Sequence, residues 1–139
     1  MCIRDRCDAG LQNLSTYINF QPKAEKVKND LLFFLLEQKI KGKKVIAYGA
    51  AAKGNTLLNY AGVQSDLLEF VCDAAPSKQE KYLPGSHIPI VDPSCLQGLA
   101  VDYVLILPWN LADEISLQLD YLREKGTKFV SAVPELRIF

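Results

Sequence analysis

The fold of this chain is decided by the stretch Val45-Ile46-Ala47-Tyr48-Gly49-Ala50-Ala51-Ala52-Lys53-Gly54-Asn55-Thr56-Leu57-Leu58. Apolar residues run into a glycine, small residues follow, and a helix-like run begins after a lysine, a second glycine and an asparagine. This order predicts a buried strand, a tight turn and the N-terminus of a helix. Such a turn presents backbone N–H groups and the positive end of a helix dipole, which favour a phosphate or another anion.

The composition narrows the class of protein. The 139 residues are 49% hydrophobic and 23% charged, which is ordinary for a globular protein and is enough for one domain with a sizeable core. Sixteen basic residues cancel sixteen acidic ones, so we expect neither nucleic acid nor an anionic membrane as the main partner. No apolar run approaches the roughly 20 residues of a membrane span. No signal-peptide pattern is visible, and we expect a cytoplasmic protein.

The four cysteines give no recognisable pattern. They are Cys2, Cys7, Cys72 and Cys95, and no two of them form a C-x-x-C pair. Cys72 falls in a predicted buried strand, whereas Cys2 and Cys7 lie in a leader without structural signals. The sequence therefore predicts neither a disulfide framework nor a zinc site.

The first residues differ from the rest of the chain. Residues 1–6 show no periodicity and resemble a translated sequencing adapter of the kind found at the ends of truncated gene calls. We expect residues 1–16 to be a leader that is partly artefactual, or a linker, and residues 17–139 to form the domain. On this interpretation the protein continues upstream, and this chain is its C-terminal part.

Outward from the opening stretch, strands and helices alternate. Strands are expected at 43–48, 67–73, within 87–91, at 101–107 and at 128–133. Helices are expected to begin at Pro22, Gly54, Pro93 and just after the capping Asn110, and to end at Gly42, Gly62, Gly98 and Gly126. The helix that begins at Pro22 is apolar nearly all round over 31–36, so we expect a wide face buried against the sheet or another domain.

This alternation predicts an α/β fold with right-handed βαβ units. The expected architecture is a Rossmann-like open parallel sheet of about five strands in the order 3-2-1-4-5, with helices on both faces. Pro89 cannot donate to a ladder, which places its strand at an edge. The carboxyl ends of the strands, at 48–55, 73–81 and 108–110, then converge on one rim, where ligands bind in such folds.

The glycine turn matches a dinucleotide fingerprint incompletely. Gly49, Ala51 and Gly54 fall on G-x-G-x-x-G, but alanine replaces the glycine that lets the backbone approach a pyrophosphate. Asp73 lies about where this fingerprint places its ribose-binding acid. The pattern alone leaves two interpretations open, a ligand-binding turn and a turn that needs small residues for packing. Lys53, a cation at the mouth of the turn, favours the ligand-binding one.

The polar loop after Asp73 also offers ligand contacts. Lys78 and Lys81 are candidates to meet phosphates, and Tyr82 is a candidate to stack on a base or a sugar. His87 is the only histidine, a residue type suited to acid–base work near neutral pH. The alternatives are an ordinary solvated loop and a structural histidine, and composition favours the solvated loop.

Trp109 and Asn110 follow the apolar run 101–107. Trp109, the only tryptophan, is a candidate stacking surface or inter-domain contact, and Asn110 is first of all a helix cap. The sequence shows no Ser/His/Asp set, no paired-carboxylate signature and no metal cluster.

Three motifs in this order resemble one family, the C-terminal domain of S-adenosylmethionine-dependent sugar C-methyltransferases. They are Tyr48-Gly49-Ala50-Ala51-Ala52-Lys53-Gly54-Asn55-Thr56-Leu57-Leu58-Asn59, the loop Asp73…Pro76…Lys78-Gln79…Lys81-Tyr82…Pro84-Gly85…His87-Ile88-Pro89-Ile90, and Leu107-Pro108-Trp109-Asn110…Glu114-Ile115. Phe129 and Pro134-Glu135 fit the family's ending. The resemblance covers about Tyr17 to Phe139.

The resemblance implies that different domains of the whole enzyme carry different functions. In the family, a zinc-binding domain and a central methyl-donor domain lie upstream, and the C-terminal domain is Rossmann-like and helps to hold a nucleotide-diphosphate keto-sugar. The enzyme removes a proton next to the ketone, and the enolate takes a methyl group from S-adenosylmethionine. The base and the donor site belong to the central domain. We therefore expect no catalytic residue, cofactor or metal in this chain, with the sugar nucleotide and the upstream domains as its partners.

What carries over to this chain is a set of substrate contacts. They are Tyr48, Gly49, Lys53, Gly54, Asn55, Asp73, Lys78, Lys81, Tyr82, His87, Trp109 and Asn110. The sequence departs from the family pattern at Glu80, where glycine is expected, and at Ala74, where a larger polar residue is expected. Both departures bear on the loop and on sugar specificity.

Two other functions remain as alternatives. One is the NAD-binding half of an oxidoreductase, against which Ala51 speaks. The other is a non-catalytic domain that only scaffolds oligomers.

Overall fold

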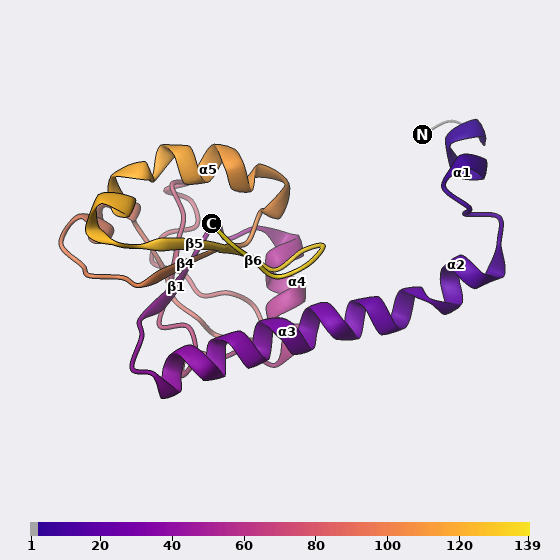
Figure 1. Cartoon of the computed structure of the whole chain (residues 1–139). Helices are drawn as coiled ribbons and strands as arrows, with labels where there is room; N and C mark the ends of the chain where they lie inside the picture. The colour runs from indigo at the N-terminus through magenta and orange to yellow at the C-terminus, as the bar shows by residue number, and fades with distance from the viewer. Residues whose placement is uncertain (1–2) are drawn as a thin grey trace.

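The computed structural model describes residues 3–139 and shows a globular α/β body from which an N-terminal helical arm projects (Figure 1). The strands are β1 (Val45–Tyr48), β2 (Val71–Cys72), β3 (Ile90–Val91), β4 (Tyr103–Ile106), β5 (Lys128–Ser131) and β6 (Arg137–Ile138). The α-helices are α1 (Ile3–Asp8), α2 (Leu14–Ile18), α3 (Phe20–Ile40), α4 (Ala52–Ala61) and α5 (Ala112–Gln118). The 3₁₀ helices are η1 (Pro93–Gln97), η2 (Trp109–Leu111) and η3 (Asp120–Lys125).

The six strands form one sheet in the order β3-β2-β1-β4-β5-β6. β1 pairs in parallel with β2 and β4, and the parallel pairing extends to β3 and β5. This confirms the Rossmann-like α/β fold and the predicted order of its five parallel strands, with the strand after Pro89 at the edge.

A sixth strand corrects the predicted end of the sheet. We expected the strand at 128–133 to be the last, but β6 returns antiparallel to β5, with Arg137 opposite Ser131. Two residues are too few to produce a periodic pattern. The second strand is also shorter than predicted, because the N–H groups of Leu67 and Leu68 turn back to the carbonyl of Gln64.

The helix expected between Asn110 and Gly126 is divided. Leu111, not Asn110, occupies the N-cap position of α5, and no side chain caps that helix in the described residues. Leu119 has φ −101° and ψ 17°, so the α-helical ladder stops there and the tighter η3 continues to Gly126. The predicted capping role of Asn110 is therefore wrong.

The sheet is covered on both faces (Figure 1). Leu31, Phe34 and Leu58, from α3 and α4, belong to one buried cluster with alternate residues of the strands. Ile115 and Leu122, from α5 and η3, belong to a second cluster on the other face. The alternation along β1 and β4 supplies apolar side chains to both clusters, which is typical of strands in a parallel sheet.

The long helix α3 is less buried than its sequence suggests. It begins at Phe20, so Pro22 lies within its first turn and not at its first position. Leu31, Phe34 and Leu35 are buried, but Phe33 is 69% exposed and Ile40 is 85% exposed. Within this chain the buried face is narrower than expected, because the body contacts only one side of the helix. Its N-terminal half projects from the body together with α1 and α2 (Figure 1).

The arm contains more helix than expected. Residues 3–8, predicted to lack regular structure, form α1. None of the helices in the described part of the chain combines the length and the apolar character that crossing a bilayer requires.

Candidate functional site

The glycine turn after β1 ties together three strand ends. Gly49 has φ +87°, and a Cβ built on it would lie 2.5 Å from Cδ of Pro108, so only glycine fits beside the end of β4. The N–H of Gly49 donates to the carbonyl of Cys72 at 2.7 Å. The N–H of Ala50 donates to Oδ2 of Asp73 at 2.7 Å. The predicted convergence of the glycine turn, the end of β2 and Pro108 on one rim is confirmed.

Asp73 is the centre of a polar network on this rim. Its side chain is nearly buried, its Oδ1 accepts the N–H of Ala75 at 2.8 Å, and its Oδ2 also accepts Nζ of Lys78 at 3.0 Å. Burial alone would raise the pKa of the Asp73 carboxyl, but hydrogen bonds from two backbone N–H groups and from Lys78 outweigh it and hold that pKa below its usual value. Nζ of Lys78 donates to the carbonyl of Ala50 as well, at 3.1 Å. Asp73 and Lys78 thus fix the conformation of the turn.

The first turn of α4 leaves its backbone donors uncapped. Ala51 occupies the N-cap position, and no side chain caps the helix in the described residues. The first N–H groups of a helix have no partner within it, so this end presents donors and positive potential. Gly54 has a packing role, because a Cβ on it would lie 2.5 Å from Cβ of Leu107. Asn55 lies beside it, and its buried Oδ1 has no hydrogen-bond partner among the described residues.

Lys53 and Trp109 face each other across the rim. Nζ of Lys53 lies 5.0 Å from the centre of the Trp109 ring, a cation–π contact. Both residues line a groove of about 580 Å³. Phe20 and Val27 of α3, Leu57 and Tyr60 of α4, and Pro134 after β5 also line it.

The contribution of α3 to this groove was not predicted. Tyr60 is 46% exposed and falls within the helix expected from Gly54, whereas Phe20 is 68% exposed and lies before the helix expected from Pro22. Their proximity depends on how α3 packs beside α4, which sequence spacing does not reveal.

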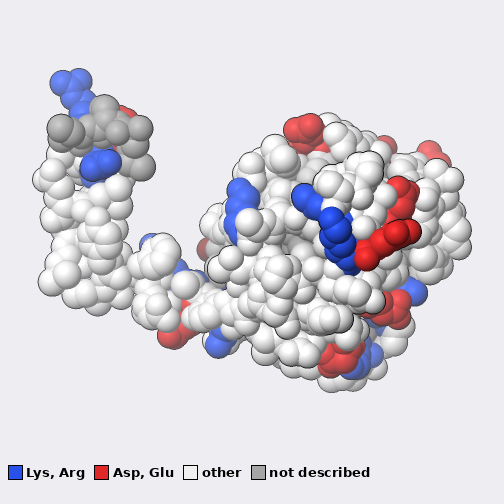
Figure 2. Space-filling view, turned by 180° about the vertical axis from the view of Figure 1, so that it is seen from behind, with Lys and Arg blue, Asp and Glu red and all other residues white. Residues whose placement is uncertain are grey.

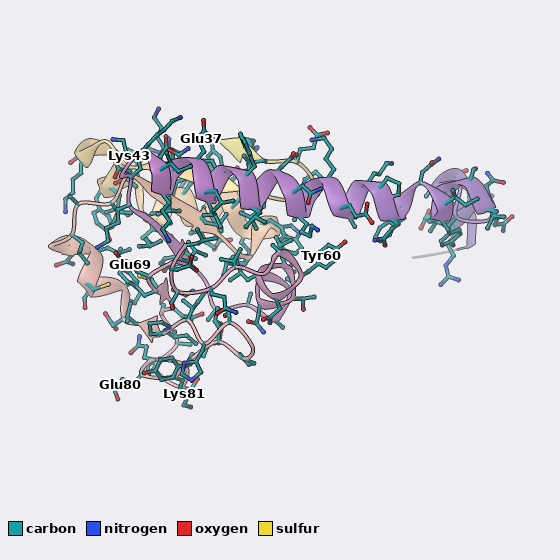
Figure 3. The ribbon with its side chains drawn as sticks, turned by 90° about the horizontal axis from the view of Figure 1, so that it is seen from below. Glu37, Lys43, Tyr60, Glu69, Glu80 and Lys81 are labelled. Carbon is teal, nitrogen blue, oxygen red and sulfur yellow. The ribbon has the colours of Figure 1, made fainter. Side chains whose placement is uncertain are left out.

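The loop that holds Lys81, Tyr82 and His87 lies apart from the groove. The rings of Tyr82 and His87 stack with centroids 4.3 Å apart, and Nζ of Lys81 donates to the carbonyl of Ser77 at 2.5 Å. Figure 3 shows Glu80 and Lys81 at an outer edge of the body, well away from Tyr60 beside α3. The predicted contacts therefore fall into two groups, one around the glycine turn and one in this loop.

Two residues of this loop have strained backbones. Glu80 has φ +61° and His87 has φ +56°, a region that favours glycine. Glu80 is the position at which the family pattern led us to expect glycine, and the backbone explains that expectation. His87 is exposed, and its ring is held against Tyr82.

Two predicted contacts lie differently from the others. Tyr48 is half-buried and packs against the core cluster beneath α5, and its burial is the main cause that raises the pKa of its hydroxyl. Asn110 is exposed in η2. Contact of either residue with a ligand remains a prediction.

Charged residues of both signs are scattered over the face of the body in Figure 2, with uncharged residues between most of them. Residues 3–139 contain no group of three or more His, Cys, Asp or Glu placed to hold a metal ion.

Comparison with known proteins places this geometry in a family. The family model described as "C-methyltransferase C-terminal domain" matches residues 2–134. The chain is 36% identical over 129 residues to C-methyltransferase NovU from Streptomyces niveus. This alignment covers 93% of the chain and 31% of NovU, so the chain spans about a third of the length of that relative.

Among solved structures, the fold is similar to UDP-D-quinovosamine 4-dehydrogenase from Vibrio fischeri. The TM-score is 0.53 at 18% identity, with 70% of this chain and 93% of that chain covered. At this identity the similarity supports the Rossmann-like fold alone. The match across nearly the whole sequence, together with NovU, decides the family: the chain belongs to the C-methyltransferase C-terminal domain family.

Proposed function

We propose that this chain is the C-terminal domain of an S-adenosylmethionine-dependent methyltransferase and that it binds the nucleotide-diphosphate keto-sugar that the whole enzyme methylates on carbon. The observation that carries the proposal is the uncapped first turn of α4, with Lys53 at its mouth and an aromatic groove alongside. A diphosphate suits backbone donors at a helix N-terminus next to a lysine. The groove offers Trp109 and Tyr60 as flat surfaces for a sugar or a base.

In this proposal the chain binds and orients the substrate, and the proton removal and methyl transfer occur on the upstream domains. Lys53 neutralises part of the diphosphate charge, which holds the sugar at the rim. The rim itself is rigid, because Asp73 and Lys78 fix the glycine turn through hydrogen bonds on both sides of Ala50. A rigid site lowers the entropic cost of positioning the reacting carbon.

In this proposal the glycine turn does not hold an adenosine cofactor. Pro108 packs closely against Gly49, and the N–H of Ala50 already donates to Asp73. The dinucleotide interpretation needs the carboxylate of Asp73 for ribose hydroxyls, whereas here that carboxylate accepts three hydrogen bonds from the protein. This arrangement favours a sugar nucleotide over NAD. It also agrees with a donor site outside this chain.

Ligand-dependent unfolding and Trp109 fluorescence test the proposal together. The purified chain is titrated separately with a thymidine-diphosphate sugar, NAD and S-adenosylmethionine. We expect a rise in melting temperature and a change in Trp109 emission with the sugar nucleotide alone. A ligand at 100 times its dissociation constant stabilises the folded state by about 2.7 kcal/mol. A response to NAD alone would overturn the proposal, and no response to any of the three would contradict substrate binding by this chain.

A matched pair of variants locates the site. Lys53→Met removes the cation beside Trp109 and should weaken sugar-nucleotide binding at least about tenfold, which corresponds to about 1.4 kcal/mol. Lys128→Met removes an exposed lysine at the start of β5, at the opposite end of the sheet, and should bind like the unaltered chain. Equal affinities for both variants would place the ligand elsewhere.

A further inference from the structure

Two cysteines from different elements meet beneath the polar rim. Sγ of Cys72, in β2, lies 3.8 Å from Sγ of Cys95, in η1. Cys72 is fully buried and Cys95 is half-buried, so Cys95 is the more exposed residue of the pair. We propose that Cys72 and Cys95 form a redox-active dithiol that a small disulfide oxidises to an intramolecular disulfide.

The difference in exposure sets the order of reaction. The thiolate of Cys95 attacks one sulfur of the small disulfide, whose S–S bond breaks and releases one thiol after protonation. Cys95 then carries a mixed disulfide. Cys72 loses its proton and attacks the sulfur of Cys95, which expels the second small thiol. The protein loses two electrons and two protons, and the small disulfide becomes two thiols.

The second step depends on proximity. Burial, and to a smaller extent the neighbouring Cys95, raises the pKa of the Cys72 thiol. Cys72 is therefore a poor nucleophile toward reagents in solution. The sulfur of Cys95 is already in contact with it, however, and an intramolecular attack has a large effective concentration. The two sulfurs must approach by about 1.8 Å to reach the S–S bond length.

The pair stands at the two ends of the polar loop. Asp73 follows Cys72 directly, and Asp92 caps the helix that holds Cys95 by accepting the N–H of Ser94 at 2.7 Å. Nε2 of Gln79 donates to the carbonyl of Asp73 and to Oδ2 of Asp92, both at 2.9 Å. A disulfide between Cys72 and Cys95 would therefore join the two ends of the loop. Gln79 already links these ends through its hydrogen bonds to Asp73 and Asp92.

Closing this base has a consequence for ligand binding that rests on the proposed function. The closed loop contains Lys78, Lys81, Tyr82 and His87, all among the proposed substrate contacts. Oxidation then restricts the conformations of the loop in the unfolded and partly open states. The redox state of the pair thereby regulates how readily the loop adjusts to a bound sugar. The chemistry of the pair does not depend on that ligand, so the two ideas fail separately.

The test uses the full 139-residue chain with Cys2→Ser and Cys7→Ser, so that only the pair remains. Glutathione disulfide is added to the folded protein, and the product is analysed by intact mass, thiol titration in urea and peptide mapping. We expect the loss of two hydrogen masses, a fall from two titratable thiols to none, and a cross-linked peptide joining Cys72 to Cys95. Dithiothreitol should reverse all three changes.

Two further variants fix the roles of the thiols. Cys95→Ser in the same background should leave Cys72 unmodified, because no accessible thiol starts the reaction. Cys72→Ala should stop at a mixed disulfide on Cys95. The melting temperature of the oxidised chain should rise by about 5 °C.

Other outcomes would overturn the proposal. A persistent mixed disulfide on Cys95 while Cys72 is present would show that the second step does not occur. Two free thiols after treatment of the folded chain, or a cross-link that forms only in urea, would show that the folded geometry does not support the bond. An oxidised chain with a lower melting temperature would show that the fold does not accommodate it.

Discussion

Oδ2 of Asp73 accepts the backbone N–H of Ala50 at 2.7 Å, which joins the end of β2 to the glycine turn after β1. The same oxygen holds Nζ of Lys78, which reaches on to the carbonyl of Ala50. A carboxylate that the fold family commonly directs toward a ribose is used here to build the turn. The rim is therefore assembled before any ligand arrives.

Asp73→Asn should destabilise the chain by about 2 kcal/mol, because a nearly buried acceptor of charge-assisted hydrogen bonds is replaced by an amide that also brings a donor. Chemical denaturation at neutral pH measures this loss. Asp66→Asn, at an exposed carboxylate, is the matched control and should change stability by less than about 0.5 kcal/mol. Equal effects in the two variants would contradict the structural role of Asp73.

The same carboxylate makes stability depend on pH. Its pKa is lowered in the folded state, so its contribution is present above the unfolded value of about 3.9 and is lost as pH falls through the folded pKa. Denaturation curves between neutral pH and pH 3 should show this loss in the unaltered chain and a smaller one in Asp73→Asn. Parallel curves for both proteins would exclude Asp73 as a source of the acid sensitivity.

Gly54→Ala should destabilise the chain by about 1–2 kcal/mol. The new methyl group would lie 2.5 Å from Cβ of Leu107, and the cost of overpacking α4 against β4 exceeds the gain in helix propensity. Gly98→Ala provides the comparison, since Gly98 has φ −100° and open space around it. Thermal unfolding of both variants measures the difference, and a stabilised Gly54→Ala would show that the contact relaxes freely.

Glu80→Gly should stabilise the chain by about 0.5 kcal/mol. Relief of the strain at φ +61° gains roughly 1–2 kcal/mol, and the greater backbone entropy of glycine in the unfolded chain offsets part of it. Gly62→Ala makes the opposite change at φ +69°, with nothing nearby, and should lose about 1 kcal/mol. Urea denaturation of the pair gives both values. A destabilised Glu80→Gly would show that the glutamate side chain contributes more than the backbone strain costs.

The isolated chain should transfer no methyl group. The proposal assigns the base and the donor to upstream domains, and the chain spans 31% of NovU. Mass spectrometry of a keto-sugar nucleotide incubated with S-adenosylmethionine and the chain provides the assay, with NovU in a parallel reaction as the comparison. Methylated product above the enzyme-free background would place the chemistry in this chain.

Much of the sheet could be predicted from local pattern. The apolar run 101–107 marked a strand that is covered on both faces, and Pro89 marked an edge, because each property acts on the residues that carry it. β6 and the break at Leu119 escaped prediction, since a two-residue strand has no period and no glycine or proline marks the break.

In the candidate site, too, one part could be predicted from the sequence and another could not. The rim was predictable because parallel strands end on one side, which brings Gly49, Asp73 and Pro108 together. The groove was not, because Phe20 and Tyr60 meet only through the packing of α3 against α4. The contact between Cys72 and Cys95 joins residues 23 positions apart and leaves no signature in their spacing.

The body determines how the projecting half of α3 is rotated about its own axis. Its buried residues Leu31, Phe34 and Leu35 fix the rotation of the helix, and the exposed turns before them carry that rotation outward to α2 (Figure 1). Each residue of an α-helix adds about 100° of rotation and about 1.5 Å of length. Deleting one residue near Glu25 would therefore rotate the preceding residues by more than a quarter turn about the helix axis and carry Phe20 out of its place in the groove, while the buried residues after the deletion keep their contacts.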